Sequence, residues 1–424
     1  MKIQKGDNMG LFDKFKKSND DSDTENFQYL DELIHSGSKE IILDTDIKIV
    51  KKEKSKYSEG IKLDIDELVI DGNGHSIDGD KKSRIFHCTG KNVTIKNITL
   101  KNGFKKDGSA IVNDGELTII KSKFKDNIGK GKKGGAIYNN NALTIKDSEF
   151  DKNGAIKGGA ICNNGEMSIV ESKFNHNHSS GGGAIANLKG LSIAESSFTE
   201  NEAQTGGAIF NEGELTITQT TLHNNFSAIG GAMTNNGGKI TVTQSTLTQN
   251  KVLDENNAKY GKIKRVGGAI LNTQGEMTII ETGVCENFSS NDGGAIYNTG
   301  KLNIVESIFN KNLSIGLGAI YNEKGEITIS KTEFNYNGAN MGGALFSEFG
   351  EITIMASTFN ENKANNNGGA ISNLGTTLNI RDSKFTKNAA DMAGGAISDD
   401  RYLNIENCIF EDNEPYDIKN YNSN

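Results

Sequence analysis

The stretch Gly134–Asn153 reads GGAIYNNNALTIKDSEFDKN, and the chain repeats this pattern for most of its length. It begins with two glycines and Ala136-Ile137, crosses the alternating triplet Leu143-Thr144-Ile145, and ends with Phe150 and Asn153. Twelve copies run from Gly108 to Asn413, starting at positions 108, 134, 158, 182, 206, 230, 267, 293, 317, 342, 368 and 394. Most steps are 24 to 26 residues and one is 37. A fixed period of this length is typical of solenoid proteins.

Several positions of the repeat are almost invariant within the chain. The alanine after the glycines is present in every copy, and the position two residues after the isoleucine is asparagine in ten copies, with Ser347 and Asp399 as exceptions. The closing asparagine occurs in all twelve copies, as Asn127, Asn153, Asn177, Asn201, Asn225, Asn250, Asn287, Asn312, Asn337, Asn362, Asn388 and Asn413. We expect these asparagines to form a structural ladder, because stacked carboxamides hydrogen-bond from one copy to the next.

Each copy contains three short segments that could be strands, and glycine or asparagine interrupts each before it reaches helical length. A unit of about 24 residues is too small to bury its own apolar face, so the units must stack. With strands in register at ~4.8 Å, Ile137 lies beneath Ile161, Phe150 beneath Phe174 and Asn153 beneath Asn177. The sequence therefore predicts an all-β fold, a parallel β-helix with one rung per repeat.

The pair of motifs GGA[IL] and FxxN resembles the chlamydial polymorphic outer membrane protein repeat, which also marks adhesin-like proteins of some bacteria and archaea. GGA is intact in ten copies, with Ser109 and Leu317 as departures, and FxxN is intact in nine. The resemblance covers about three quarters of the chain. It implies a right-handed, single-stranded parallel β-helix of the pectate-lyase type. The twelve copies and three irregular N-terminal rungs predict about fifteen rungs. The resemblance also implies a cell-surface adhesin-like protein, although a fold does not fix a function.

The repeats divide the chain into five parts. Residues 1–25 are a polar leader that we expect to be disordered. Residues 26–107 hold irregular first rungs and a short amphipathic helix at 26–37, which we expect to cover the first rung. Residues 108–413 hold the twelve repeats, interrupted by a basic loop at 251–266. Residues 414–424 form a polar tail, and we expect a weak or absent C-terminal cap.

Composition narrows the classes of function. The net charge of −8 argues against general nucleic-acid binding. The four cysteines occupy different positions of distant rungs, so we expect free thiols. The sequence shows no signal peptide, anchor or transmembrane stretch, so the residues leave the location open, and the resemblance implies the cell surface.

A catalytic site on a β-helix needs converging carboxylates and cations on one strand face. One outward position carries Glu116, Glu166, Glu214, Glu276, Glu326 and Glu351. Of these, Glu326 and Glu351 alone lie on adjacent rungs, and the repeat places no histidine or arginine beside them. His176 and His178 would point the same way in an extended strand, but two imidazoles without a third ligand make a weak metal site. We therefore predict no catalytic, cofactor or metal site.

Two other outward positions form columns. One carries Tyr138, Phe210, Leu271, Tyr297, Tyr321 and Phe346. Because Tyr297, Tyr321 and Phe346 lie on consecutive rungs, they predict an exposed aromatic stripe that could bind sugars or proteins, or else ordinary cross-strand stacking. The other column carries Thr118, Thr144, Thr216, Thr241, Thr278, Thr328 and Thr353. Its neighbouring position is mixed, so the flat two-column array of an ice-binding face is missing.

These observations lead to one hypothesis and two alternatives. The hypothesis is a non-catalytic, adhesin-like β-solenoid that presents a long face to a glycan or surface protein of a host or neighbouring cell. The first alternative is a polysaccharide-acting enzyme, a lyase, hydrolase or esterase, with an unrecognised site. The second alternative is a structural spacer.

Overall fold

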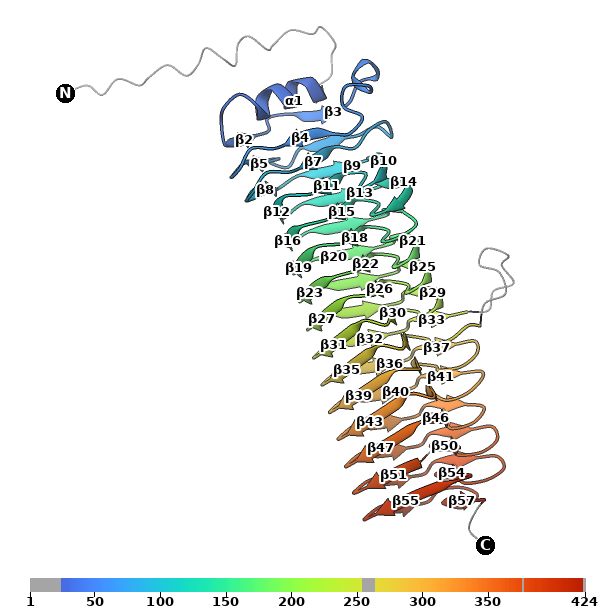
Figure 1. Ribbon diagram of the computed structural model, residues 1–424. Coiled ribbons are helices and arrows are strands. Elements are labelled where there is room, and N and C mark those ends of the chain that lie inside the picture. The colour runs from blue at the N-terminus through green and yellow to red at the C-terminus, as the bar shows by residue number, and fades with distance from the viewer. Residues whose placement is uncertain (1–23, 254–263, 376, 422–424) are drawn as a thin grey trace, which may run out of the picture.

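The computed structural model describes residues 24–253, 264–375 and 377–421, which wind into a long right-handed solenoid of about fifteen turns (Figure 1). At ~4.8 Å per turn the solenoid is ~70 Å long. The two ends of the described chain lie at opposite ends of it. The predicted right-handed parallel β-helix is confirmed.

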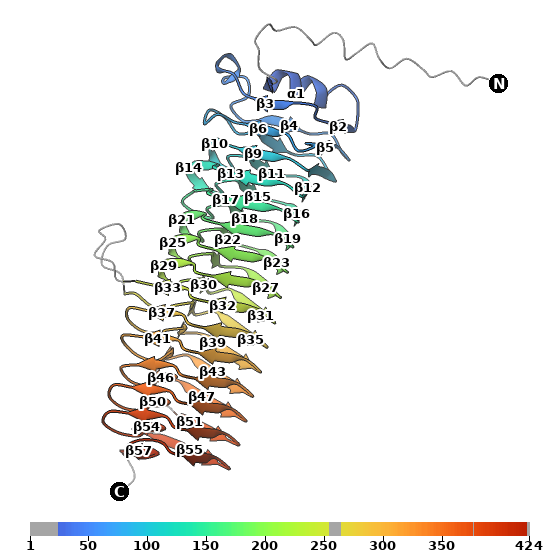
Figure 2. The ribbon, with the colours of Figure 1, turned by 180° about the vertical axis from the view of Figure 1, so that it is seen from behind.

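Gly134–Asn153 builds one turn from three strands, each in its own parallel sheet. The strand β15 (Ile137–Asn139) belongs to sheet C, which runs from β4 (Ile61–Leu63) to β57 (Ile418–Asn420). The strand β16 (Ala142–Lys146) belongs to sheet B, from β2 (Glu40–Ile42) to β55 (Tyr402–Glu406). The strand β17 (Glu149–Asp151) belongs to sheet A, from β1 (Thr24–Glu25) to β56 (Ile409–Glu411). Seen from behind, strands of sheet B follow one another along one edge (Figure 2).

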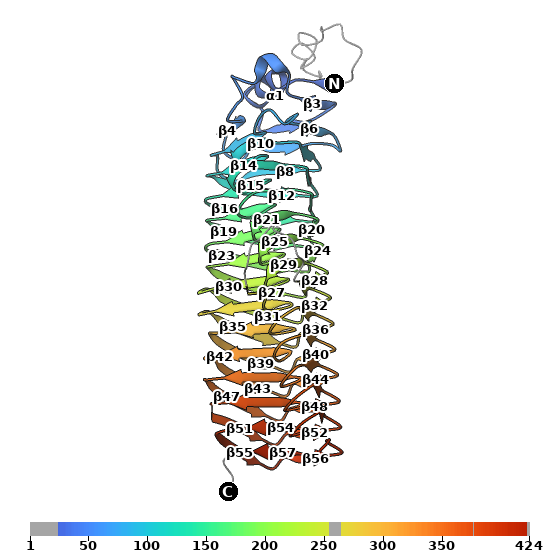
Figure 3. The ribbon, with the colours of Figure 1, turned by 90° about the vertical axis from the view of Figure 1, so that its right-hand side faces the viewer.

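A fourth sheet was not predicted. After most of the closing asparagines the chain adds a short strand, and nine of these strands form sheet D, from β21 (His178–Gly181) to β53 (Ala389–Ala390). Figure 3 shows β21, β25 (Glu202–Thr205) and β29 (Phe226–Ile229) stacked along the solenoid axis. Two earlier turns contribute a separate pair, β10 (Phe104–Asp107) and β14 (Ile128–Lys133). Many D strands have two residues and no apolar alternation, so no periodicity marks them.

The core consists of the ladders that the repeat predicts. Ile137 pairs with Ile161 and Phe150 with Phe174, all fully buried. The rings of Phe124, Phe150, Phe174 and Phe198 stack at 4.6 to 4.7 Å, nearly parallel. Leu222, Leu247 and Val284 continue the column before phenylalanine resumes at Phe309. Because successive side chains of a strand point to opposite faces, the same repeat positions face the inside of every turn.

The closing asparagines form a buried ladder at the bend after sheet A. Asn153 donates from its side-chain amide to Oδ1 of Asn177 at 3.0 Å and to the carbonyl of Phe124 at 3.0 Å. The same Oδ1 accepts the backbone N–H of Asn153. A second ladder follows sheet C, where Asn139 donates to Asn163 at 2.7 Å. Each amide satisfies polar groups that the bend would otherwise bury unpaired.

The N-terminal end is covered by α1 (Phe27–Ile34), within the predicted range 26–37 (Figure 1). Asn26 caps this helix by accepting the N–H of Tyr29 at 3.0 Å, and Phe27, Leu30 and Ile34 are fully buried. A short 3₁₀ turn, Lys51–Glu53, follows. Gly37, with φ near 97°, lies beyond the end of the helix.

Three of the predicted segments are only partly described. Of the leader 1–25, residues 1–23 lie outside the described residues, and Thr24–Glu25 form β1 rather than disordered chain. Of the loop 251–266, residues 254–263 lie outside them, and Lys251–Val252 form β33. Within the tail 414–424, β57 pairs with β54 (Ile397–Asp399). The last turn leaves Tyr402 67% and Ile409 52% exposed.

Candidate functional surfaces

The predicted aromatic stripe is not exposed, which corrects that expectation. Tyr297, Tyr321 and Phe346 do lie on consecutive strands of sheet C, but they are only 6%, 3% and 2% exposed. Val266 packs with them, and Leu317 and Met341 pack against the same cluster. Val266, Leu317 and Met341 each stand directly before a glycine with positive φ, and they pack over the aromatic side chains on the outside of sheet C. The column is therefore the core of a second, outer layer.

The two tyrosine hydroxyls are held by carboxylates. Tyr297 donates a short hydrogen bond to Glu323, and Tyr321 donates to Glu348 at 3.0 Å. Burial raises the pKa of both tyrosines above the usual range, and the hydrogen-bonded carboxylates raise it further. Neither hydroxyl can lose a proton near neutral pH, so the cluster offers packing rather than proton transfer.

The last residues of the predicted basic loop anchor on this cluster. Lys264 donates to the Tyr297 hydroxyl at 3.2 Å and pairs with Asp292 at 3.2 Å. Its ammonium group lies 5.0 Å and 5.3 Å from the ring centroids of Tyr297 and Tyr321. Lys133 makes the same contacts with Tyr138, at 3.2 Å to the hydroxyl and 5.0 Å to the ring. A lysine over the sheet C column is thus a recurring structural contact.

The predicted carboxylate pair lies as expected, on adjacent strands of sheet B. Glu326 pairs in register with Glu351, and both are exposed. Lys301 forms an ion pair with Glu326 at 3.4 Å. A general acid and a general base need different environments that push their pKa values apart. Glu326 and Glu351 are both exposed, so this pair lacks that difference.

The two histidines do not point the same way along a strand. His176 has φ near 53°, so it belongs to a turn, and it bonds Asp151 at 3.0 Å and Glu200 at 3.0 Å. His178 begins β21, on the other side of the buried Asn177. The assumed extended conformation is wrong for this reason. In the described chain, no group of three His, Cys, Asp or Glu side chains has a metal-binding arrangement.

The four cysteines are free thiols, as predicted. Cys88 and Cys162 are fully buried, and burial raises the pKa of each to about 12. Burial also raises the pKa of Cys285 and Cys408. A thiol with so high a pKa is a poor nucleophile at neutral pH.

The outward face of sheet B carries an unbroken column of short polar side chains. Register places one hydroxyl or carboxamide on every strand from β8 (Val93–Lys96) to β55. The column consists of Thr94, Thr118, Thr144, Ser168, Ser192, Thr216, Thr241, Thr278, Asn303, Thr328, Thr353, Asn379 and Asn404. The predicted threonine column contained seven of these residues, but it lacked Thr94 and its continuity was missed, because serine and asparagine were not grouped with threonine.

Gly190 opens a hollow in this face. It stands in the carboxylate column between Glu166 and Glu214, and a Cβ at this position would collide with the Glu166 carboxylate. Two adjoining hollows of about 400 and 620 Å³ share these three residues. Ser168 and Ser192 line the smaller one, and their hydroxyls are 3.3 Å apart. A glycine within a column of glutamates was the sequence signal for this hollow.

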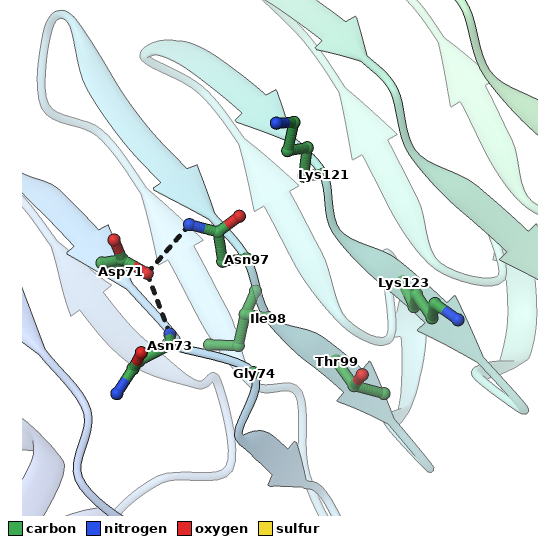
Figure 4. A pocket seen from close by; sticks show the side chains of 8 residues that line it. All are labelled: Asp71, Asn73, Gly74, Asn97, Ile98, Thr99, Lys121 and Lys123. Atoms are coloured by element: carbon green, nitrogen blue, oxygen red, sulfur yellow. Dashed lines mark hydrogen bonds between the residues drawn. The ribbon is translucent and has the colours of Figure 1, made fainter.

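A third hollow, of about 560 Å³, lies near the N-terminal end, at the turn from sheet B to sheet A (Figure 4). Its lining includes Asn97, Thr99, Lys121 and Lys123. The Asp71 carboxylate accepts hydrogen bonds from the Asn73 N–H at 2.9 Å and the Asn97 amide at 3.1 Å. Lys96 pairs with the same carboxylate at 3.3 Å, which satisfies its charge locally.

Comparisons with known proteins found a match to a family model and a similar solved structure. Residues 356–374 match the sequence model of the Chlamydia polymorphic membrane protein repeat. Among solved structures the chain is similar to tailspike protein 3 of bacteriophage CBA120, with 13% identity and a TM-score of 0.49. That alignment covers 93% of this chain and 61% of the tailspike, so this chain spans less than two thirds of the tailspike's length. No curated protein matches the sequence. No helix in the described residues is long and apolar enough to cross a membrane.

Proposed function

We propose that the protein is a non-catalytic, adhesin-like solenoid that presents the outward face of sheet B to a glycan or surface protein of another cell. The column of hydroxyls and carboxamides from Thr94 to Asn404 carries this proposal. These groups both donate and accept hydrogen bonds, as the hydroxyls of a sugar do. Their short side chains also lose little conformational freedom on binding.

The rigid scaffold supports the same function. Each polar group from Thr94 to Asn379 stands on a strand with a neighbour on both sides, and ladders of buried leucine, isoleucine and asparagine side chains fix these strands. The groups are therefore spaced regularly at ~4.8 Å before any ligand arrives. Binding to such a preorganised row costs less ordering entropy than binding to a loop. The match to the polymorphic membrane protein repeat supports a cell-surface location.

The hollow at Gly190 gives a specific test. The variant Gly190→Glu continues the carboxylate column and closes the hollow, because Glu166 and Glu214 occupy the same strand position. The Glu166 carboxylate, the mobile end of an exposed side chain, has to move aside for the new Cβ. We expect this variant to weaken glycan binding about tenfold on an array or in calorimetry. The variant Thr377→Glu adds the same charge at the same strand position outside the hollow and should bind as the parent does. Equal binding by both variants would remove the hollow from the proposal.

One observation favours the alternative of a polysaccharide-acting enzyme. Glu166 and Glu214 lie on the strands to either side of Gly190, with backbones ~10 Å apart, and the Glu166 carboxylate reaches into the space that a Gly190 side chain would fill. Paired carboxylates across an open subsite are the arrangement that glycoside hydrolysis requires. The enzyme would be established if the parent cleaves a polysaccharide and Glu166→Gln and Glu214→Gln each abolish the cleavage. The variants Glu326→Gln and Glu351→Gln should then remain active. Absence of both glycan binding and polysaccharide cleavage in the parent protein would leave the structural spacer.

A further inference from the structure

Charge is unevenly distributed along this acidic chain. Residues 81–157 contain 17 Lys and Arg but seven Asp and Glu, a net charge of +10, whereas the whole chain carries −8. These basic residues lie on strands and turns of residues 81–157, near the N-terminal end of the solenoid. A local positive field on an acidic protein attracts anions to one place and repels them elsewhere.

Four of these lysines form a continuous group, which we call the lysine cluster: Lys101, Lys121, Lys123 and Lys125. Lys125 lies directly beside Lys101 on the neighbouring strand of sheet A, and Lys123 lies beside Thr99. Lys121 occupies the turn into the same strand, β13 (Lys123–Lys125), with φ near 48°. Like charges on adjacent strands destabilise a sheet.

The cluster is poorly neutralised by the protein itself. Lys123 pairs with Glu149 at 3.4 Å, an exposed contact that contributes little. Within the described residues, Lys101, Lys121 and Lys125 form no ion pair closer than 4 Å. Lys101 lies in register with Asp78 and Lys125 with Asp151, on the strands to either side, but neither lysine closes an ion pair with them. These ammonium groups can therefore still turn to an external anion.

The hollow of Figure 4 adjoins this cluster and adds neutral polar groups. Lys121 and Lys123 form part of its lining, together with Asn73, Asn97 and Thr99 (Figure 4). The one carboxylate there, Asp71, is already bound by Lys96 and two N–H groups. Cations beside amides and a hydroxyl match a ligand that carries both negative charge and hydroxyl groups.

We propose that the lysine cluster and its hollow bind an acidic sugar unit of a linear anionic polysaccharide. Lys121 and Lys123 hold the anionic group, the amides and hydroxyl of the hollow bind the sugar hydroxyls, and Lys101 and Lys125 bind the next charge along sheet A. Nucleic acid fits less well, because the lining of the hollow has no aromatic side chain on which a base could stack. The site lies on a different part of the solenoid from the Gly190 hollow, so it does not depend on the function proposed above.

The test compares polygalacturonate with its neutral methyl ester as ligands of the same backbone. We expect the parent protein to bind the acidic polymer, to bind it less tightly as salt is raised, and not to bind the ester. The variant Lys101→Gln, Lys121→Gln, Lys125→Gln should bind about tenfold more weakly. Glutamine already occupies the turn position of Lys121 in other repeats, at Gln219 and Gln244, so the fold should tolerate it. The single variant Lys121→Gln provides a second, milder measurement.

The matched control is Lys311→Gln, Lys363→Gln, Lys387→Gln, which removes the same charge from exposed lysines of the C-terminal half. This control should bind polygalacturonate as the parent does. The charge-preserving variant Lys101→Arg, Lys121→Arg, Lys125→Arg should also retain binding. Equal affinity of the parent and the glutamine cluster variant would overturn the proposal. Tighter binding of single-stranded DNA than of polygalacturonate would also overturn it. The variant Gly190→Glu should leave polygalacturonate binding intact. A failure of the lysine-cluster proposal can therefore be told apart from a failure of the function proposed for sheet B.

Discussion

The side-chain amide of Asn201 donates to Oδ1 of Asn225 at 3.0 Å, and both residues are fully buried. Asn201 also donates to the carbonyl of Phe174 at 2.9 Å, and its own Oδ1 accepts two N–H groups from Asn177. One side chain therefore joins three turns. We expect Asn201→Ala to lower the free energy of unfolding by about 1–3 kcal/mol, because it leaves buried groups unpaired. Urea unfolding measures this, with the half-buried Thr199→Ala as control; equal midpoints would contradict the ladder's role.

The inward phenylalanine column gives a second prediction. Phe198 is fully buried and stacks on Phe174 at 4.7 Å, while Leu222 fills the same position in the next turn. We expect Phe198→Ala to cost about 3–5 kcal/mol through a cavity. Phe198→Leu should cost less, because the neighbouring turn already accommodates leucine. The ratio of the two costs in denaturant unfolding checks the packing, and similar costs would mean that the ring itself rather than its volume is required.

Much of this fold could be predicted because the repeat fixes the register. Once Asn153 and Asn177 are aligned, alternation decides which neighbours face the core, and the ladders follow. Alternation does not show whether the outside of a sheet is covered by more chain. Leu317 and Met341 cover Tyr321 from the variable segments before the glycines, and periodicity could not place those segments. The hollow at Gly190 could have been predicted from the sequence, because the aligned repeats show a glycine where the neighbouring turns have Glu166 and Glu214.

The buried position of Tyr321 reverses the effect expected of its replacement. An exposed stripe could be changed to serine without loss of stability, whereas Tyr321 is 3% exposed and hydrogen-bonded to Glu348. We now expect Tyr321→Ser to cost roughly 3 kcal/mol or more through lost packing. Tyr321→Phe should cost about 1 kcal/mol, because it removes only the hydroxyl. Thermal unfolding checks both, with the half-buried Tyr138→Ser as the milder comparison. An unchanged melting temperature for Tyr321→Ser would mean that the outer layer does not form.

The second asparagine ladder ends in a carboxylate, and that carboxylate gives a pH-dependent prediction. Asp399 accepts from the Asn373 amide at 2.6 Å and from the Arg401 N–H at 3.0 Å, and it is 1% exposed. Burial raises its pKa above the ordinary value, although the two hydrogen bonds oppose the shift. A carboxyl group whose pKa is higher in the folded state stabilises the fold below its unfolded pKa of about 4. That contribution is lost as the pH rises through the folded pKa.

At neutral pH the fold therefore carries the cost of a buried charge at Asp399. Asparagine would remove that charge and keep one of the two accepting oxygens. Elsewhere in this ladder one Oδ1 is enough, because that of Asn163 accepts from both Asn139 and the Gly165 N–H. We expect Asp399→Asn to raise the melting temperature at neutral pH and to have a much smaller effect below about pH 4, where the aspartate is protonated. Asp412→Asn, at an exposed position, is the matched control and should change little at either pH. Calorimetric melting of the three proteins across this pH range measures the difference. A gain of the same size at both pH values would show that the carboxylate is not protonated preferentially in the folded state, and the assigned direction of its pKa would be wrong.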